Sequence, residues 1–386
     1  MIEHIADDSS KVIRKRQVYY LSGFDPRGAR HYHQLFREEA GLQAAVNGVQ
    51  IRVGSREKTG DHAVTWPVVV EGNGQKTVTR YTFLVWDDVI RDHWPASMWT
   101  VILRMPAFYM AYALTGTFKR LWGRSKRMVA TLLIPLVLGL FAVAVAALNV
   151  WAWPGWIGLP LCATLLWGAA KLADRWQLIW LSRIYLFVHF WARGGNPALD
   201  DRWRVLAKHI DDDMASNPDS DEVLLVGHSI GCMAGVAVLG EWLKAFGSGK
   251  GNGRFWAGKL RFITLAHSIP VLSFFPTATV FREQAQVVGG SSVPWLDISA
   301  PIDPLCMALS DPLAGSGSLI QCHPRVIVRS ARFDKMFDQN KYKALSRDAF
   351  RIHFQYLMAT DLPVSNDYFS ITAGHKSLSH WMEPRS

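Results

Sequence analysis

Cysteine and charge are both scarce in this sequence. It holds 4 Cys among 386 residues, and no two of them form a Cys-x-x-Cys pair. This spacing excludes a disulfide scaffold and argues against a zinc ribbon. Charged residues make up only 19% of the chain and apolar residues 49%, a balance that excludes extensive disorder. The length allows two average domains or one large domain with an insertion.

Acidic residues are fewer than basic ones. Lys and Arg total 42 against 32 Asp and Glu, which gives a formal charge of +10. The basic residues are scattered and do not form a nucleic-acid-binding module with aromatic residues, so we expect no nucleic-acid partner. We instead assign the positive charge to a surface that faces an anionic membrane. The first fifteen residues have no apolar run, so we expect no secretory signal.

The longest uncharged stretch predicts contact with lipid. The 43 residues from Met128 to Ala170 contain no Asp, Glu, Lys, Arg or His. As one helix they would be roughly 65 Å long, about twice the hydrocarbon thickness of a bilayer. The sequence Trp-Ala-Trp-Pro-Gly-Trp at 151–156 permits a reversal and suits the head-group level. We therefore predict a transmembrane helical hairpin with arms at about 128–151 and 156–173.

The flanking charges predict the orientation of this hairpin. Basic residues lie before and after it, at Lys119, Arg120, Arg124, Lys126, Arg127, Lys171 and Arg175. By the positive-inside rule both ends face the cytoplasm, so we expect a multi-pass protein of the cell (inner) membrane. Segments 95–117 and 176–192 are also apolar but contain Arg104 and Arg183 near their centres. We interpret them as interfacial or supporting helices and leave further spans open.

Outside this region, strand-like and helix-like segments alternate. Strands are expected at 17–21, 50–53, 66–71, 77–86, 222–226, 260–265, 295–299 and 324–329, and helices at 29–46, 199–215, 230–246 and 341–359. The alternation predicts an α/β fold with a mostly parallel sheet and helices on both faces. The expected parts are a tail at 1–15, an α/β domain at 16–92 and 199–386, and a membrane-associated insertion at 93–198.

The most specific chemical motif is Gly227-His228-Ser229-Ile230-Gly231. An apolar strand precedes it and a helix with small residues follows it. Such a turn exposes the serine hydroxyl at the carboxyl end of a strand, and the glycines leave room for the adjacent backbone. The backbone N–H of Ile230 can then face a developing oxyanion. We predict that Ser229 is a nucleophile and that His228 packs inside the turn.

The segment Leu224–Gly231 resembles the nucleophile elbow of lipases and esterases in the α/β-hydrolase superfamily. The resemblance covers 17–90 and 200–370 in the order of elements, and only the elbow is specific. It implies a triad in the chain order Ser, then Asp or Glu, then His. Two features depart from the family: no clear pair of strands precedes 17–21, and the insertion lies before the nucleophile strand.

The acid is expected at the end of the strand at 295–299. Asp303 lies there in a loop between two prolines, similar to the strand-end Asp-Pro of lipase-like members, and could orient an imidazole. Asp311, which precedes Pro312, and Asp297, inside the strand, are the alternatives.

The base is expected after the last strand. His353 begins an apolar helical stretch, and its His-x-x-Tyr pattern is similar to triad histidines of lipase-like members. The alternative base is His375, which lies in a polar glycine loop, and His323 is a weaker third candidate.

The second oxyanion donor is expected in the loop that follows the first strand. In Ser22–Gly28, Gly23 allows close approach and the N–H of Phe24 is the candidate donor, with an ordinary β-turn as the alternative. The His31-Tyr32-His33 sequence could suggest a metal, but its helical context favours a helix face. We expect no metal and no cofactor.

These predictions together indicate a membrane-anchored serine hydrolase. Its expected substrate is an ester or thioester of a lipid or another acyl compound, because the site would lie near a bilayer. An acyltransferase that uses the same acyl-enzyme and an inactive hydrolase-like membrane scaffold are the alternatives. A transporter component is disfavoured because the hairpin has no intramembrane charge.

Overall fold

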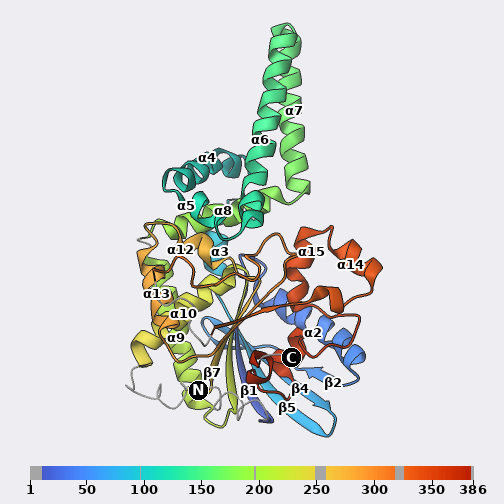
Figure 1. Ribbon diagram of the computed structural model, residues 1–386, viewed down its shortest axis with the longest axis vertical. Coiled ribbons are helices and arrows are strands. Elements are labelled where there is room, and N and C mark those ends of the chain that lie inside the picture. The colour runs from blue at the N-terminus through green and yellow to red at the C-terminus, as the bar shows by residue number, and fades with distance from the viewer. Residues whose placement is uncertain (1–10, 96, 195–196, 248–257, 318–325, 384–386) are drawn as a thin grey trace.

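A mixed sheet forms the centre of the molecule (Figure 1). The computed structural model describes residues 11–95, 97–194, 197–247, 258–317 and 326–383. Within these residues the sheet has 9 strands in the order β2-β4-β5-β1-β6-β7-β8-β9, and β3 pairs with β4. The strands are β1 (Lys15–Leu21), β2 (Gln50–Val53), β3 (Glu57–Gly60), β4 (Ala63–Gly72), β5 (Gln75–Leu84), β6 (Glu222–His228), β7 (Leu260–Leu265), β8 (Trp295–Ser299) and β9 (Val326–Ser330).

The sheet is parallel from β5 through β1 to β9 and antiparallel at its other edge. β4 and β5 form the predicted hairpin, and the turn residues Asn73 and Gly74 have φ values of 52° and 71°, as a tight two-residue turn requires. β2 and β4, which follow β1 in the chain, form the antiparallel edge of the sheet beyond β5. The predicted α/β fold with a mostly parallel sheet is confirmed.

Alternating side chains divide the interior into two hydrophobic cores. On β1, Tyr19 and Leu21 enter one core and Val18 and Tyr20 the other, because successive strand residues face opposite sides. The first face is covered by α9 (Pro197–Ser216), α10 (Ile230–Phe246), α12 (Ile269–Ser273) and α13 (Thr279–Gly289). The second is covered by α2 (Gly28–Asn47), α14 (Gln339–Leu345), α15 (Ala349–Phe354), α16 (Tyr368–Ala373) and α17 (Ser379–Met382).

Two long helices project from this body as an antiparallel pair (Figure 1). They are α6 (Lys126–Ala152) and α7 (Gly155–Arg175), and their length and composition suffice to cross a membrane. Only 22% and 11% of the residues in their most apolar windows are buried, whereas a core helix of a soluble protein would be mostly buried. The chain reverses at Trp153-Pro154, and Trp151 and Trp156 near the tip are 86% and 78% exposed.

The remaining helices of the expected insertion pack on the body. They are α4 (Met98–Leu114), α5 (Thr117–Trp122) and α8 (Leu178–Ala192), and the short helix α3 (Asp87–Asp92) directly precedes the insertion. Phe108 of α4 and Tyr185 of α8 stack in the first core, with ring centroids 5.5 Å apart. In the described part of the insertion, α4, α5 and α8 therefore contribute to the first core, whereas the α6–α7 pair projects from the body (Figure 1).

A buried ion pair joins β1 to β6 at their amino ends. The side chains of Arg16 and Glu222 are 0% and 3% exposed, and they lie 2.8 Å apart. The Arg16 guanidinium also donates to the carbonyls of Gly374 and Lys376, and Glu222 accepts from the Leu378 N–H. The pair thus attaches the C-terminal segment to the amino ends of the two central strands.

Replacing Arg16 with Met should lower the free energy of unfolding by about 3–5 kcal/mol, because Glu222 would keep a buried charge without its partner. Lys15→Met is the matched control. Lys15 is 61% exposed and pairs with an exposed Asp219, so we expect a loss of about 0–1 kcal/mol. Denaturant unfolding of the detergent-solubilised protein, followed by Trp fluorescence, measures both. Equal losses would contradict this account.

Candidate active site

The candidate site lies where the sheet reverses its winding order. β1 and β6 are parallel neighbours, and Leu21 is opposite Gly227 at their carboxyl ends. After β1 the chain goes to β2, β4 and β5 on one side, and after β6 it goes to β7 on the other. Adjacent strands whose connections diverge leave a crevice outside their carboxyl ends, where ligands bind in open α/β sheets.

Ser229 occupies a strained turn in this crevice. Its φ and ψ are 56° and −123°, a conformation that costs a non-glycine residue about 1–3 kcal/mol. The turn is held by the Ser229 N–H, which donates to Leu265 O at 2.9 Å. A Cβ at Gly231 would overlap the carbonyl oxygens of Leu21 and Ser22, so the strand-turn-helix crossing requires glycine there. In the described part of the chain, the Ser229 hydroxyl has no hydrogen-bond partner.

A helix break positions His353. The prediction of one continuous helix at 341–359 is wrong. Asp348 adopts an extended conformation and caps a new helix, α15. The Asp348 carboxylate accepts the N–H groups of Phe350 and Arg351 at 3.1 and 2.9 Å, which satisfies the first turn. His353 then lies in the last turn of α15 and is 5% exposed.

His353 and Asp303 meet in the interior. His353 Nδ1 lies 2.8 Å from Asp303 Oδ2, and Asp303 is fully buried. Burial raises the pKa of the Asp303 carboxyl, but the charge of His353 and the hydrogen bonds from His353 and Leu305 outweigh it, so the pKa lies below its usual value. A carboxylate on Nδ1 leaves Nε2 as the ring nitrogen available to another group.

Two neighbouring side chains hold this pair in place. His228 Nε2 lies 2.8 Å from the carbonyl oxygen of His353, and burial followed by the charge of His353 lowers the His228 pKa to about 3. His228 is therefore neutral and packs within the elbow. The Tyr356 hydroxyl accepts the Ala300 N–H at 2.8 Å, which ties the segment after His353 to the loop that carries Asp303.

Ser229 and His353 line the same small cavity, of about 40 Å³. Within the described residues no hydrogen bond joins the two side chains, although catalytic contacts are often long before substrate binds. The other walls are mainly apolar and come from the base of α6, from α8, α10 and α12, and from the loop after β8: Met128, Leu132, Leu181, Ile184, Tyr185, Val188, Met233, Val271 and Leu305. An apolar group could therefore lie beside the serine.

The two candidate oxyanion donors follow β1 and β6. Neither the Phe24 N–H nor the Ile230 N–H has an acceptor within the described residues. The loop after β1 runs against the serine, because a Cβ at Gly23 would lie 3.1 Å from Ser229 Cβ and 3.6 Å from its Oγ. The Phe24 ring is buried against Phe187 of α8, with centroids 4.6 Å apart, so the position of its backbone is set by core packing.

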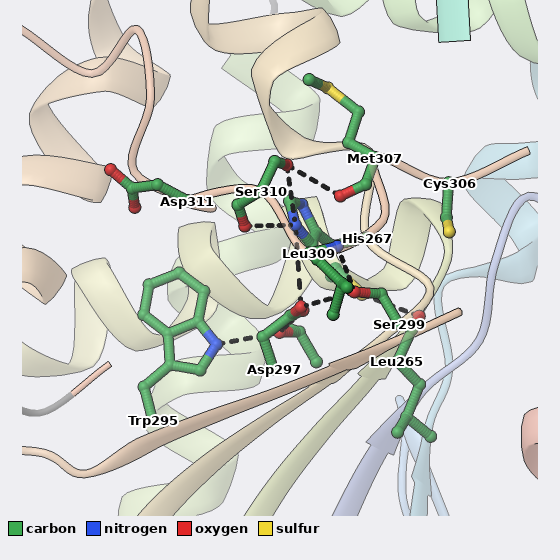
Figure 2. A network of polar contacts seen from close by, with 12 residues as sticks. Leu265, His267, Trp295, Asp297, Ser299, Cys306, Met307, Leu309, Ser310 and Asp311 are labelled. Carbon is green, nitrogen blue, oxygen red and sulfur yellow. Dashed lines mark hydrogen bonds and ion pairs between the residues drawn. The ribbon is translucent and has the colours of Figure 1, made fainter. Parts of the chain in front are cut away.

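The alternative acids have other partners. Figure 2 shows Asp297 inside a buried network, where its carboxylate accepts from Thr264 and Ser299 and lies 3.8 Å from His267 Nε2. Burial raises the pKa of the Asp297 carboxyl. The network supports the Asp303 loop, because Ser299 Oγ also accepts the Leu309 N–H. Asp311 points away from this network and accepts the Leu313 N–H in a turn.

The alternative bases do not meet Ser229. His375 lies at the amino ends of the strands, where its carbonyl accepts the Ile13 N–H. It is therefore separated from Ser229 by the length of β6, roughly 20 Å. His323 lies outside the described residues. His33 contacts the Gly54 carbonyl at 2.9 Å, and no group of three metal-binding side chains occurs in the described residues.

Sequence patterns did not point to Arg127. Its guanidinium donates to the carbonyls of Pro301 and Ile302, the second at 3.1 Å. Arg127 lies in the first turn of α6, so the base of the projecting pair is attached to the loop that carries Asp303. Two tyrosines, Tyr109 and Tyr185, donate to the carbonyls of Leu132 and Thr131, near the point where Pro135 interrupts the bonding of α6.

The depressed pKa of Asp303 predicts a pH-dependent stability. The carboxylate stabilises the fold above its unfolded pKa of about 3.9, and this contribution is lost as the pH falls through the lower folded-state pKa. The free energy of unfolding of the wild type minus that of Asp303→Asn should therefore shrink between about pH 5 and about pH 3. Denaturant unfolding of both proteins tests this, and a constant difference would contradict it.

Comparison with known proteins adds no relative. The chain matches no protein-family model, no curated protein and no solved structure at a significant level. A functional assignment therefore depends on the geometry of the site.

Proposed function

We propose that the protein is a membrane-anchored serine hydrolase of the α/β-hydrolase type that cleaves an ester or thioester. The observation that carries the proposal is the buried hydrogen bond between Asp303 and His353, because His353 lines the same cavity as Ser229 on its strained turn. Nucleophile, base and orienting acid in such an arrangement form the general pattern of acyl transfer.

In the proposed reaction, Ser229 Oγ attacks the carbonyl carbon while His353 Nε2 takes the hydroxyl proton. The carbonyl electron pair moves to oxygen, where the N–H groups of Phe24 and Ile230 stabilise the charge. Collapse breaks the bond to the leaving alcohol or thiol, which receives the proton from His353. Water then attacks the acyl-serine, its proton passes to His353, and the released serine recovers that proton. Asp303 orients the imidazole and stabilises its charged form.

The α6–α7 pair is proposed as the membrane anchor. The exposed part of α6 from Ile134 to Ala152 and the whole of α7 are each about 30 Å long, which matches the hydrocarbon core. Lipid would cover exposed apolar side chains along both helices: Val137, Leu140, Phe141, Val143, Leu148, Leu159 and Trp167. The positive-inside rule and the basic residues at both ends of the pair support our proposal that the α/β body faces the cytoplasm at the cell (inner) membrane.

The place of the cavity supports an apolar acyl substrate. Met128 and Leu132 belong to the base of α6 and line the same cavity as Ser229. The cavity is thus lined in part by the same helix that we propose as an anchor, and its apolar walls suit an acyl chain. A lipid ester is therefore the substrate class that we propose.

Covalent labelling with a fluorophosphonate probe tests the nucleophile. The detergent-solubilised wild type should be labelled, and Ser229→Ala should not, because the probe needs an activated serine. His353→Ala should lose at least about 100-fold in labelling rate, since it removes the general base.

His375→Ala is the matched histidine control for this test. It should keep the wild-type rate, because His375 lies at the amino ends of the strands and Ser229 lies at the carboxyl end of β6. Absence of labelling in folded wild type, in detergent and in liposomes, would instead favour an inactive scaffold.

The contact between Arg127 and the Asp303 loop gives a second test. Arg127→Ala should slow labelling by about fivefold, because two hydrogen bonds that position the loop are lost. Arg124→Ala is the matched control. It removes the same charge three residues earlier, and in the described residues the Arg124 side chain has no bond to the loop. Equal slowing by both variants would show an effect of membrane charge alone.

A further inference from the structure

A second, larger hollow adjoins the catalytic cavity. It is a groove of about 570 Å³ whose walls combine apolar side chains, such as Leu35, Trp180 and Met358, with the polar and charged side chains Asp25, Arg27 and Arg351. Trp180 and Phe350 line both spaces, and their ring centroids are 4.6 Å apart. An aromatic pair therefore separates the groove from the serine, and a substrate that crosses this pair would occupy both spaces.

The groove contains two carboxylates and two guanidinium groups, and the guanidinium groups keep N–H donors for a ligand. Asp25 is occupied by the Nε and Nη2 groups of Arg27 and by the Tyr32 hydroxyl, and Asp348 Oδ1 accepts two backbone N–H groups of α15. In the described residues, Arg27 Nη1 has no acceptor and the Arg351 guanidinium has neither a hydrogen bond nor an ion pair. Planar guanidinium donors with free N–H groups suit an oxyanion such as phosphate.

Arg27 is held ready for such a ligand. Its bidentate contact with Asp25 fixes the guanidinium, and the guanidinium carbon lies 5.7 Å from the centroid of the Phe354 ring. The side chain is still 49% exposed. A cation that is already oriented loses less conformational entropy when an anion binds.

The groove begins beside the candidate oxyanion donor and ends at the base of the membrane pair. Asp25 to Arg27 directly follow Phe24, so this end of the groove begins next to the candidate oxyanion donor, while Ser229 itself lines the apolar cavity. Gln177 lies in the turn between α7 and α8, close to the basic residues Lys171 and Arg175. With α6 and α7 in a bilayer, this end of the groove lies at the level of the lipid head groups.

We propose that the groove binds the phosphate-bearing head group of a membrane phospholipid, whose scissile acyl ester lies at Ser229 and whose acyl chain enters the apolar cavity. This inference rests on the proposed hydrolase function and adds a substrate class to it. The leaving group is then a lysophospholipid, which takes the proton from His353, and the retained group is the fatty acyl chain.

Two lipids with the same acyl chains test the inference. The full-length protein is placed in vesicles of non-hydrolysable dialkyl ether phosphatidylcholine that carry either phosphatidylglycerol or diacylglycerol, and fatty acid release is measured. We expect the wild type to prefer phosphatidylglycerol. Arg351→Ala should lower this preference about tenfold, which corresponds to one charge-assisted hydrogen bond.

Arg347→Ala is the matched control, because Arg347 is exposed on the same segment and lies outside the groove lining. It should keep the wild-type preference. Arg351→Lys should recover part of the preference, since it restores a positive charge without the planar guanidinium. Equal loss in the alanine variants at 347 and 351, or no loss in either, would overturn the proposal.

Two further measurements separate the possible failures. Fluorophosphonate labelling of every variant reports the serine itself: labelling without lipid preference overturns only the head-group assignment, and absence of labelling in the wild type overturns the hydrolase and this inference together. Inorganic phosphate is added as a competitor of p-nitrophenyl butyrate hydrolysis. Competition that requires Arg351, with no preference between the two lipids, would identify free phosphate as the ligand and overturn the lipid assignment.

Discussion

The pairing of β1 with β6 is the contact on which the rest of the structure depends. These strands are neighbours in the sheet although the whole insertion lies between them in the chain. At their amino ends, the buried pair of Arg16 and Glu222 aligns the strands and holds the C-terminal segment. At their carboxyl ends, the same alignment brings the loop with Gly23 against Ser229. Because both strands belong to one sheet, the α6–α7 pair must leave the body and return to the same side.

The site is built from three segments that follow different strands, and each is held by its own local contacts. A strained turn presents Ser229, an Asp348 cap starts the short helix of His353, and a turn held by its own hydrogen bonds carries Asp303. The three meet because the parallel strands that precede them end at one edge of the sheet. Arg127 adds a fourth segment, since it attaches the base of α6 to the Asp303 loop. A change in the position of α6 would therefore act on the Asp303 loop through Arg127 and on the wall of the Ser229 cavity through Met128 and Leu132.

Local patterns in the sequence were sufficient for most of the elements. The apolar strand before Ser229, the Asn73-Gly74 turn and the uncharged run of α6 and α7 are properties of neighbouring residues, and the structure places each of them as predicted. The prediction of one helix at 341–359 was wrong. The helical spacing of apolar residues continues across Asp348, but the Asp348 side chain caps a new helix and so interrupts the predicted one there. The order of β2 and β4 after β1 also escaped prediction, since strand pairing has no local signal.

The sequence by itself determined the α/β class, the projecting pair of apolar helices and the elbow at Ser229, because each depends on periodicity or turn chemistry within about twenty residues. Only the tertiary structure decided which histidine meets which carboxylate. His353 and Asp303 are 50 residues apart and Arg127 and Pro301 are 174 apart, and no pattern along the chain encodes such distances. His375 has the same chemistry as His353, yet the fold places it at the amino ends of the strands, because hydrogen bonds from Arg16 and Ile13 hold its segment there.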